Sequence, residues 1–143
     1  MKLKVRHQRA GGFTLIELLT AIGVAGILMA IAVPQFMSLL PTIYLRSAAR
    51  QVAVDLQLAR TRAISQNIQY AVAFNPGTGA YTFGADTRDL NQLFPGTQIT
   101  AVAPANPTFN PVGTATANTT ITVSNGGANR QVQINTMGRV MVP

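Results

Sequence analysis

The chain has 143 residues, of which 48% are hydrophobic and only 10% are charged. A soluble domain usually has about a quarter of its residues charged, so we expect an apolar segment in addition to an ordinary core. The absence of cysteine excludes disulfides and thiolate metal sites, and with them the disulfide-stapled class of small secreted domains.

The first twelve residues form a basic segment that ends in two glycines. The formal net charge of +7 is concentrated in this segment, because four of the eleven basic residues lie in its first nine positions: Lys2, Lys4, Arg6 and Arg9. The remainder has seven basic residues against four acids, which leaves a net charge of about +3. The basic pI therefore describes the N-terminus and does not indicate a nucleic-acid-binding protein.

An apolar run, FTLIELLTAIGVAGILMAIAV, extends from Phe13 to Val33. As a helix it would be about 31 Å long, enough to cross the hydrocarbon core of a bilayer. We expect one helix over residues 13–66, with a membrane-spanning part at 13–36. Pro34 is expected to kink this helix rather than end it.

The second half of the expected helix has a one-sided pattern. Apolar residues recur there at spacings of three and four, and arginine and glutamine largely fall between them. This pattern predicts an apolar stripe that packs on a domain. The stripe consists of Leu45, Ala49, Val52, Leu56, Ala59 and Ala63.

Residues 67–143 are rich in Thr, Asn, Gly and Pro and contain short β-like runs. Strands are predicted at residues 68–74, 81–83, 99–102 and 140–142, with a hairpin at 120–134 around Asn125-Gly126-Gly127. Prolines at 104, 107 and 111 predict a loop. The expected fold class is α+β: a long N-terminal helix, membrane-spanning in its first half and amphipathic in its second, packed on a C-terminal antiparallel β-sheet domain.

A basic stretch before an apolar run has three common interpretations: a secretory signal peptide, a plain membrane anchor or a prepilin leader. A signal peptide has its small-residue cleavage site after the apolar region, whereas the glycine pair of this chain lies before it. The upstream Lys and Arg residues favour a cytoplasmic location for this end of the chain.

The sequence G-F-T-L-I-E at residues 12–17 resembles the processing motif of type IV prepilins and type II secretion pseudopilins. The resemblance implies that residues 1–12 are a leader, that a prepilin peptidase cuts between Gly12 and Phe13, and that the new amine of Phe13 is N-methylated. It also implies a single-pass protein of the bacterial inner membrane with its globular domain in the periplasm. Such a protein later enters a pilus or pseudopilus filament.

Glu17 lies one turn into the apolar run, where a carboxylate costs about 3 kcal/mol by insertion scales. It either snorkels to the interface or pairs with a cation. After cleavage the amine of Phe13 supplies such a cation, in the same subunit or in the next subunit of a filament. The family resemblance favours the intersubunit pair, which would set the axial register during filament assembly.

The helix end LQLARTRAI at residues 56–64, followed by the strand at 68–74, resembles the GspH/FimT family of minor pseudopilins and pilins. The layout of the last strands is similar as well. The resemblance implies a subunit that primes or caps a type IV pilus or a type II secretion pseudopilus. Its partners would be other pilin or pseudopilin subunits, the prepilin peptidase and the inner-membrane assembly platform. The sequence does not separate the two machines.

The same resemblance implies an alternative, a minor pilin that binds DNA for uptake in natural transformation. The C-terminal G-R-x-R element that some FimT-type proteins use for DNA is matched at residues 138–141 only by its first arginine, Arg139. Arg130 on the neighbouring strand would supplement it, and Arg88 if its loop lies nearby. Scattered surface arginines are the simpler interpretation, because electrostatic affinity follows the number of phosphates neutralised.

Neither enzymatic activity nor a cofactor or metal ion is expected. The only histidine, His7, lies in the predicted leader. Asp86 and Asp89 are expected in a solvated loop with Arg88 between them, because two carboxylates alone make a poor calcium site. The chain is expected to be a substrate of the peptidase rather than an enzyme itself.

Overall fold

The structure is a computed structural model that describes residues 12–143, so the predicted leader lies outside the described residues except for Gly12. The described chain divides into two compact units, residues 12–38 and Leu39–Pro143. The helix α1 (Leu15–Gln66) contributes to both of them.

The first unit contains the apolar beginning of α1. An 18-residue window of the helix has a mean hydropathy of 2.3, and none of that window is buried. By length and composition alone, α1 could therefore cross a membrane. The helix does not end at Pro34, as expected from the helical pattern that continues beyond it.

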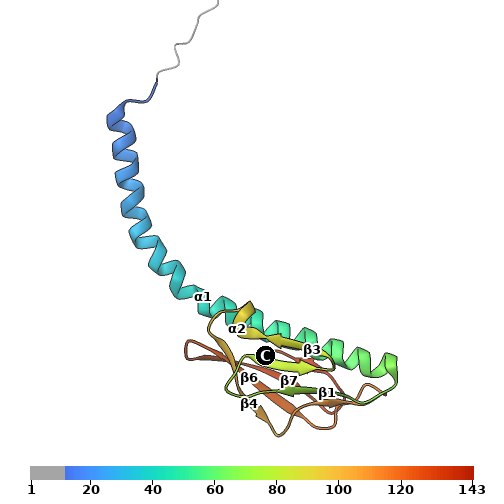
Figure 1. The fold of residues 1–143 in the computed structure, drawn as a ribbon. Helices are drawn as coiled ribbons and strands as arrows, with labels where there is room; N and C mark the ends of the chain where they lie inside the picture. Colours follow the sequence, from blue (N-terminus) through green and yellow to red (C-terminus); the bar gives the residue numbers. More distant parts are fainter. Residues whose placement is uncertain (1–11) are drawn as a thin grey trace, which may run out of the picture. The chain divides into compact units, whose positions relative to one another are not determined.

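In the second unit α1 lies along a layer of strands (Figure 1). The predicted apolar stripe is buried in full, which confirms the amphipathic pattern of this half. The structure adds two further buried residues to the same face, Ala48 and Asp55. Several of the stripe residues are alanines, whose short side chains let the helix lie close to the strands.

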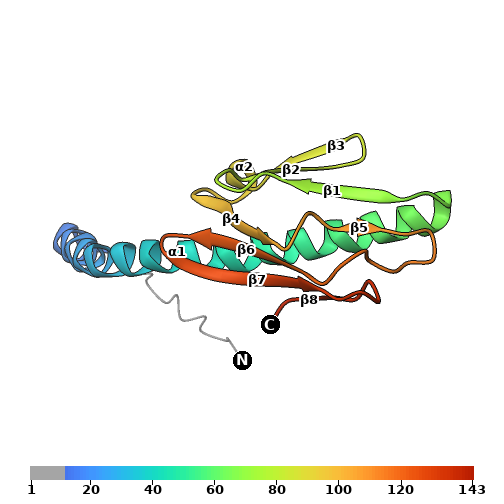
Figure 2. The ribbon, with the colours of Figure 1, turned by 90° about the horizontal axis from the view of Figure 1, so that it is seen from below.

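The strand layer consists of two antiparallel four-stranded sheets, with the orders β3-β2-β1-β5 and β4-β6-β7-β8 (Figure 2). A short helix, α2 (Leu90–Leu93), follows β3. The strands are β1 (Tyr70–Phe74), β2 (Ala80–Phe83), β3 (Asp86–Asp89), β4 (Thr97–Ala103), β5 (Thr108–Phe109), β6 (Thr119–Asn125), β7 (Ala128–Ile134) and β8 (Val140–Met141).

In β1 and β6 alternate residues are buried, as the period of a strand with one buried face requires. In β1 the buried residues are Tyr70, Val72 and Phe74, and β6 buries every second residue along its whole length. These side chains and the stripe of α1 form one hydrophobic cluster. The predicted α+β class, a long N-terminal helix packed on an antiparallel β-sheet domain, is confirmed.

The hairpin between β6 and β7 is also confirmed. Asn125 pairs with Ala128 across a two-residue turn, Gly126-Gly127, whose φ angles are 58° and 86°. Two positive φ angles are typical of the tight turn that suits the twist of a hairpin, and glycine adopts them without steric cost.

Two predictions about loops are wrong. Residues 86–89, expected in a solvated loop, form β3, which pairs with β2 over its whole length. The proline-rich segment predicted as a loop contains β5, where Phe109 is fully buried and pairs with Tyr70 of β1. β3 pairs with the adjacent β2 across the two-residue turn Gly84-Ala85, and β5 pairs with β1, more than thirty residues earlier in the chain. In both strands backbone pairing supplies the stability, which side-chain patterns do not reveal.

Candidate processing and assembly site

The predicted cleavage bond between Gly12 and Phe13 lies in an accessible segment. Residues 12–14 precede α1 and are not helical, and the Phe13 side chain is 90% exposed. A peptidase reaches an exposed bond outside regular structure more easily than a bond within a helix. The geometry is thus compatible with cleavage, and the roles of both residues in processing stay predictions.

Thr14 and Glu17 form a capping box at the first turn of α1. The hydroxyl oxygen of Thr14 accepts a hydrogen bond of 3.3 Å from the backbone N–H of Glu17. In return Oε2 of Glu17 accepts bonds of 3.0 and 2.9 Å from the backbone N–H and the hydroxyl of Thr14. These bonds satisfy backbone donors that a helix start leaves without partners. The pattern Thr-x-x-Glu before an apolar run is the sequence sign of this motif, which our sequence analysis missed.

The capping box uses only one oxygen of the Glu17 carboxylate. Within residues 12–143, Oε1 takes part in none of the hydrogen bonds formed by Glu17. Phe13 directly precedes Thr14, so an amine created there would lie close to the capped carboxylate of the same chain. Capping is therefore a third interpretation of Glu17, beside snorkelling and pairing with an amine.

The helix surface beyond Glu17 is apolar and exposed. Its large hydrophobic side chains between Leu18 and Leu39 are 49 to 66% exposed. The hydroxyl of Thr20 donates to the carbonyl oxygen of Ile16 at 2.9 Å, so it is not left without a partner on this surface. A helix that is apolar on all sides requires lipid or other apolar helices around it.

The two arginines of the DNA hypothesis lie at opposite ends of β7. Arg130 pairs with Val123 near the hairpin turn. Arg139 lies beyond the other end, where its backbone N–H donates to the side-chain oxygen of Asn135. Asn135 follows Arg130 by five residues of extended chain, which corresponds to about 16 Å along the strand. The structure does not bring these arginines into one patch, and contact of either with DNA stays a prediction.

Asp55 is a buried charged residue that our sequence analysis did not assign to the core. Its side chain is in the buried stripe, and the residue is 2% exposed. Oδ2 accepts a hydrogen bond of 2.5 Å from the hydroxyl of Tyr81 and lies 3.5 Å from Nε of Arg88, while Gln51 donates to Oδ1 at 3.2 Å. Burial of Tyr81, together with its bond to Asp55, raises the pKa of the Tyr81 hydroxyl above its usual value. The spacing of Asp55 from Val52 and Ala59 already placed it on the buried face.

Asp86 and Asp89 have structural partners instead of lying free in a loop. Asp86 forms a salt bridge of 2.5 Å with Arg62 of α1. Hydrogen bonds to Tyr70 and to Asp86 raise the pKa of the Arg62 guanidinium. Asp89 caps α2 by accepting a hydrogen bond of 2.9 Å from the backbone N–H of Asn91. These carboxylates therefore stabilise the junctions of α1, β3 and α2.

An apolar N-terminal helix that continues along antiparallel sheets, with a glycine before its first residues, is typical of pilin-like subunits. Two solved structures share the fold. The type IV minor pilin FimU of Pseudomonas aeruginosa is 19% identical, with a TM-score of 0.57 over 69% of this chain and 92% of that chain. The minor pseudopilin EpsH from the Type 2 Secretion System of Vibrio cholerae is 15% identical, with a TM-score of 0.57 over 69% of this chain and 95% of that chain.

Sequence comparisons agree with the fold. Pilin-like protein PilA1 of Thermus thermophilus is 29% identical over 151 residues, covering 90% of this chain and 95% of that protein. Residues 7–33 match the prokaryotic N-terminal methylation motif, and residues 48–138 match the family described as Type II transport protein GspH. Because the second match covers more than half of the chain, the protein belongs to the GspH family. The predicted resemblance to minor pilins and pseudopilins is confirmed.

Proposed function

We propose that this protein is a minor subunit that primes or caps a type IV pilus or a type II secretion pseudopilus after removal of its leader. The match to the methylation motif over residues 7–33 carries this proposal, because it includes both the Gly12–Phe13 bond and Glu17. Two relatives in fold, one a type IV minor pilin and one a minor pseudopilin, support it. A prepilin peptidase and an inner-membrane assembly platform would be its partners, beside other pilin-like subunits.

In this proposal the apolar half of α1 holds the subunit in the inner membrane, with its globular unit in the periplasm. Cleavage removes the basic leader and creates an amine at Phe13. During assembly the helix exchanges lipid for neighbouring helices, so hydrocarbon burial hardly changes and packing and polar pairs decide the outcome. Oε1 of Glu17, which the capping box leaves free, then accepts a hydrogen bond from the Phe13 amine of the neighbouring subunit. This charged pair sets the axial register of the filament.

Substitutions of Glu17 separate charge pairing from helix capping. Glu17→Gln retains a capping-box residue but removes the negative charge, whereas Glu17→Val removes both. We expect both variants to insert into the membrane. We also expect the amount of each variant in sheared filaments to fall about tenfold or more. A tenfold fall corresponds to about 1.4 kcal/mol of binding free energy, which is less than an ion pair in an apolar surrounding contributes. Immunoblots of sheared and membrane fractions measure both quantities.

Thr14→Val is the matched control, because it removes the capping hydroxyl and leaves the charge of Glu17 in place. It should enter filaments at nearly the native level. Normal incorporation of Glu17→Gln together with loss of Glu17→Val would attribute the role of Glu17 to capping and refute the pairing with an amine. Processing is tested separately by mass spectrometry. The native chain should lose residues 1–12, and Gly12→Val should keep them.

Deletion of the gene separates the two machines. Loss of sheared pili, restored by complementation, would indicate a type IV pilus. Normal pili with a loss of exoprotein secretion would indicate a secretion pseudopilus. If the wild-type protein is absent from every sheared filament fraction, the proposed function is wrong.

A further inference from the structure

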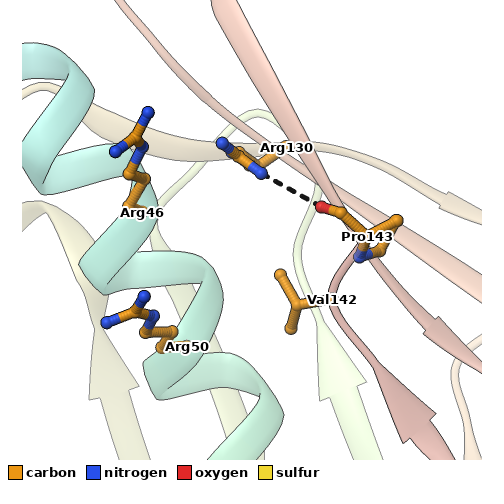
Figure 3. A pocket seen from close by; sticks show the side chains of 5 residues that line it. All are labelled: Arg46, Arg50, Arg130, Val142 and Pro143. Carbon is orange, nitrogen blue, oxygen red and sulfur yellow. Dashed lines mark hydrogen bonds between the residues drawn. The ribbon is translucent and has the colours of Figure 1, made fainter.

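Three arginines line one pocket of about 260 Å³ in the second unit: Arg46, Arg50 and Arg130 (Figure 3). Val142 and Pro143 complete its lining. Arg46 and Arg50 are both exposed and lie one turn apart on α1. Arg130 donates a hydrogen bond of 3.0 Å to a main-chain oxygen of Pro143, as Figure 3 shows.

The fold directs Arg130 toward the helix. It lies on the face of β7 that also carries the buried residues Val132 and Ile134, and it continues their row toward the hairpin turn. A side chain at the turn residue Gly126 would contact Pro41 of α1, so this end of the hairpin lies against the helix. The guanidinium of Arg130 is therefore held beside α1, where two further positive charges already lie.

Within residues 12–143, no acidic side chain lines this pocket. All four acidic residues of the chain lie in this range: Glu17, Asp55, Asp86 and Asp89. Two of them form ion pairs with other arginines, and the remaining two cap α1 and α2. Like charges one turn apart on a helix, such as those of Arg46 and Arg50, repel each other. An anion in the pocket would relieve this repulsion.

We propose that the pocket binds the carboxylate of an Asp or Glu side chain presented by a neighbouring filament subunit. The inference rests on the proposed filament role of the chain and adds a second polar contact between subunits. Guanidinium groups offer paired N–H donors that match the two oxygens of a carboxylate. Within residues 12–143 every basic residue is an arginine, so this chemistry is available at each positive charge.

The arrangement of charge favours a single carboxylate over the phosphates of a nucleic acid. A nucleic-acid strand requires a groove of cations that follows its repeating phosphates. Here the three arginines line a single pocket together with Val142 and Pro143. The other arginines do not extend it into a strip: Arg62 and Arg88 pair with acids, Arg60 donates to backbone carbonyls, and Arg139 lies at the far end of β7.

The double variant Arg46→Gln/Arg50→Gln tests the inference. Both side chains are exposed, so the melting temperature should be unchanged or higher, since the repulsion is removed. The amount of subunit in sheared filaments should fall about tenfold, because loss of a buried intersubunit charge pair weakens binding at least this much. Arg139→Gln removes one exposed charge outside the pocket and should leave the amount at the native level.

The location of the partner is tested in assembled filaments. The native chain lacks cysteine, so Val142→Cys can be labelled at a single position with a photo-activated cross-linker. We expect a cross-link to a pilin-like subunit within a peptide that contains Asp or Glu. A cross-link to a peptide without an acidic residue would contradict the proposal.

Two further outcomes overturn the inference without affecting the filament role. If the double variant enters sheared filaments in the same amount as the native chain, the pocket makes no assembly contact. The second outcome comes from a binding measurement, in which full-length protein in detergent micelles is mixed with a short DNA duplex or with vesicles that contain phosphatidylglycerol. If binding to either probe is lost in the double variant while incorporation is unchanged, the pocket is a site for phosphate, and the probe identifies its source.

Discussion

Removal of the Asp55 carboxylate should destabilise the second unit more than the loss of any exposed charge. In Asp55→Ala the Tyr81 hydroxyl loses an acceptor at 2.5 Å, and Tyr81 is only 2% exposed. A buried donor without a partner costs about 1–3 kcal/mol, and breaking a buried ion pair costs about 3–5 kcal/mol. Because the side chain of Arg88 is 43% exposed and can return to solvent, we expect a loss at the lower end, about 3 kcal/mol.

A double-mutant cycle isolates the bond between these two residues. Tyr81→Phe alone should cost about 1.5–3 kcal/mol, the value of a hydrogen bond to a charged group. In the Asp55→Ala background the same change should be neutral or stabilising, because it removes the hydroxyl that has lost its acceptor. The expected coupling energy is therefore at least about 1.5 kcal/mol.

Urea unfolding of the full-length protein in detergent micelles measures these energies. Near-UV circular dichroism follows the second unit, which contains all three tyrosines of the chain, and Tyr44 and Tyr70 still report when Tyr81 is replaced. The exposed control Arg139→Ala should change the unfolding free energy by less than about 0.5 kcal/mol. A coupling energy below about 0.5 kcal/mol would refute the conclusion that the Asp55–Tyr81 bond joins α1 to β2.

Three further predictions use the same unfolding assay. Burial and a hydrogen bond to a carboxylate raise the pKa of Tyr81 in the folded chain. The unfolding free energy should therefore not depend on this group below about pH 10. Above that pH it should fall, because the hydroxyl then loses its proton in the unfolded chain but not in the folded one. The expected slope is about −1.4 kcal/mol per pH unit, and Tyr81→Phe should abolish it. Arg60→Ala removes hydrogen bonds of 2.8 and 3.5 Å to the carbonyl oxygens of two turns and should lower the unfolding free energy by about 1–2 kcal/mol, whereas no change would show that the turns hold without it. Gly138→Ala should cost more than about 3 kcal/mol, because φ is 74° and the added methyl group would overlap the carbonyl oxygen of Gly113. Gly127→Ala, at φ 86° with open space around it, should cost only about 1 kcal/mol, and equal losses for the two variants would contradict the steric explanation.

The features that could be predicted from the sequence are those with local causes. The period of the stripe from Leu45 to Ala63 follows from helix geometry, and the structure buries every residue of it. The hairpin around Gly126-Gly127 follows from turn chemistry, because few residues other than glycine adopt two successive positive φ angles. Both features depend on neighbours in the chain, so no knowledge of the fold was needed.

The missed strands carry little hydrophobic signal of their own. β3 is a polar edge strand without alternating burial, and its existence depends on backbone pairing with β2. β5 is only two residues long and is held by β1, more than thirty residues earlier in the chain. Local patterns of hydrophobicity cannot identify such strands, because their side chains carry little of the signal.

The candidate site also has one part that could be predicted from the sequence and one part that could not. The motif at residues 12–17 and the capping box inside it are contiguous, and both could be recognised from the sequence. The arginine pocket could not, because α1 and β7 bring together residues about eighty positions apart. Arg130 and Arg139, the pair suggested by the sequence, are near each other in the chain, but Arg130 lies near the hairpin turn of β7 and Arg139 lies beyond the other end of that strand.

The use of the four acids has a consequence for assembly. Asp55 and Asp86 are bound to arginines of their own chain, and Asp89 and Glu17 cap helices. A carboxylate of a second copy of this chain would have to share its two oxygens between the arginine pocket and one of these internal contacts. A different subunit with a free carboxylate would fill it without such a cost. If the pocket is an assembly contact, as we propose, its charge favours unlike neighbours over self-association.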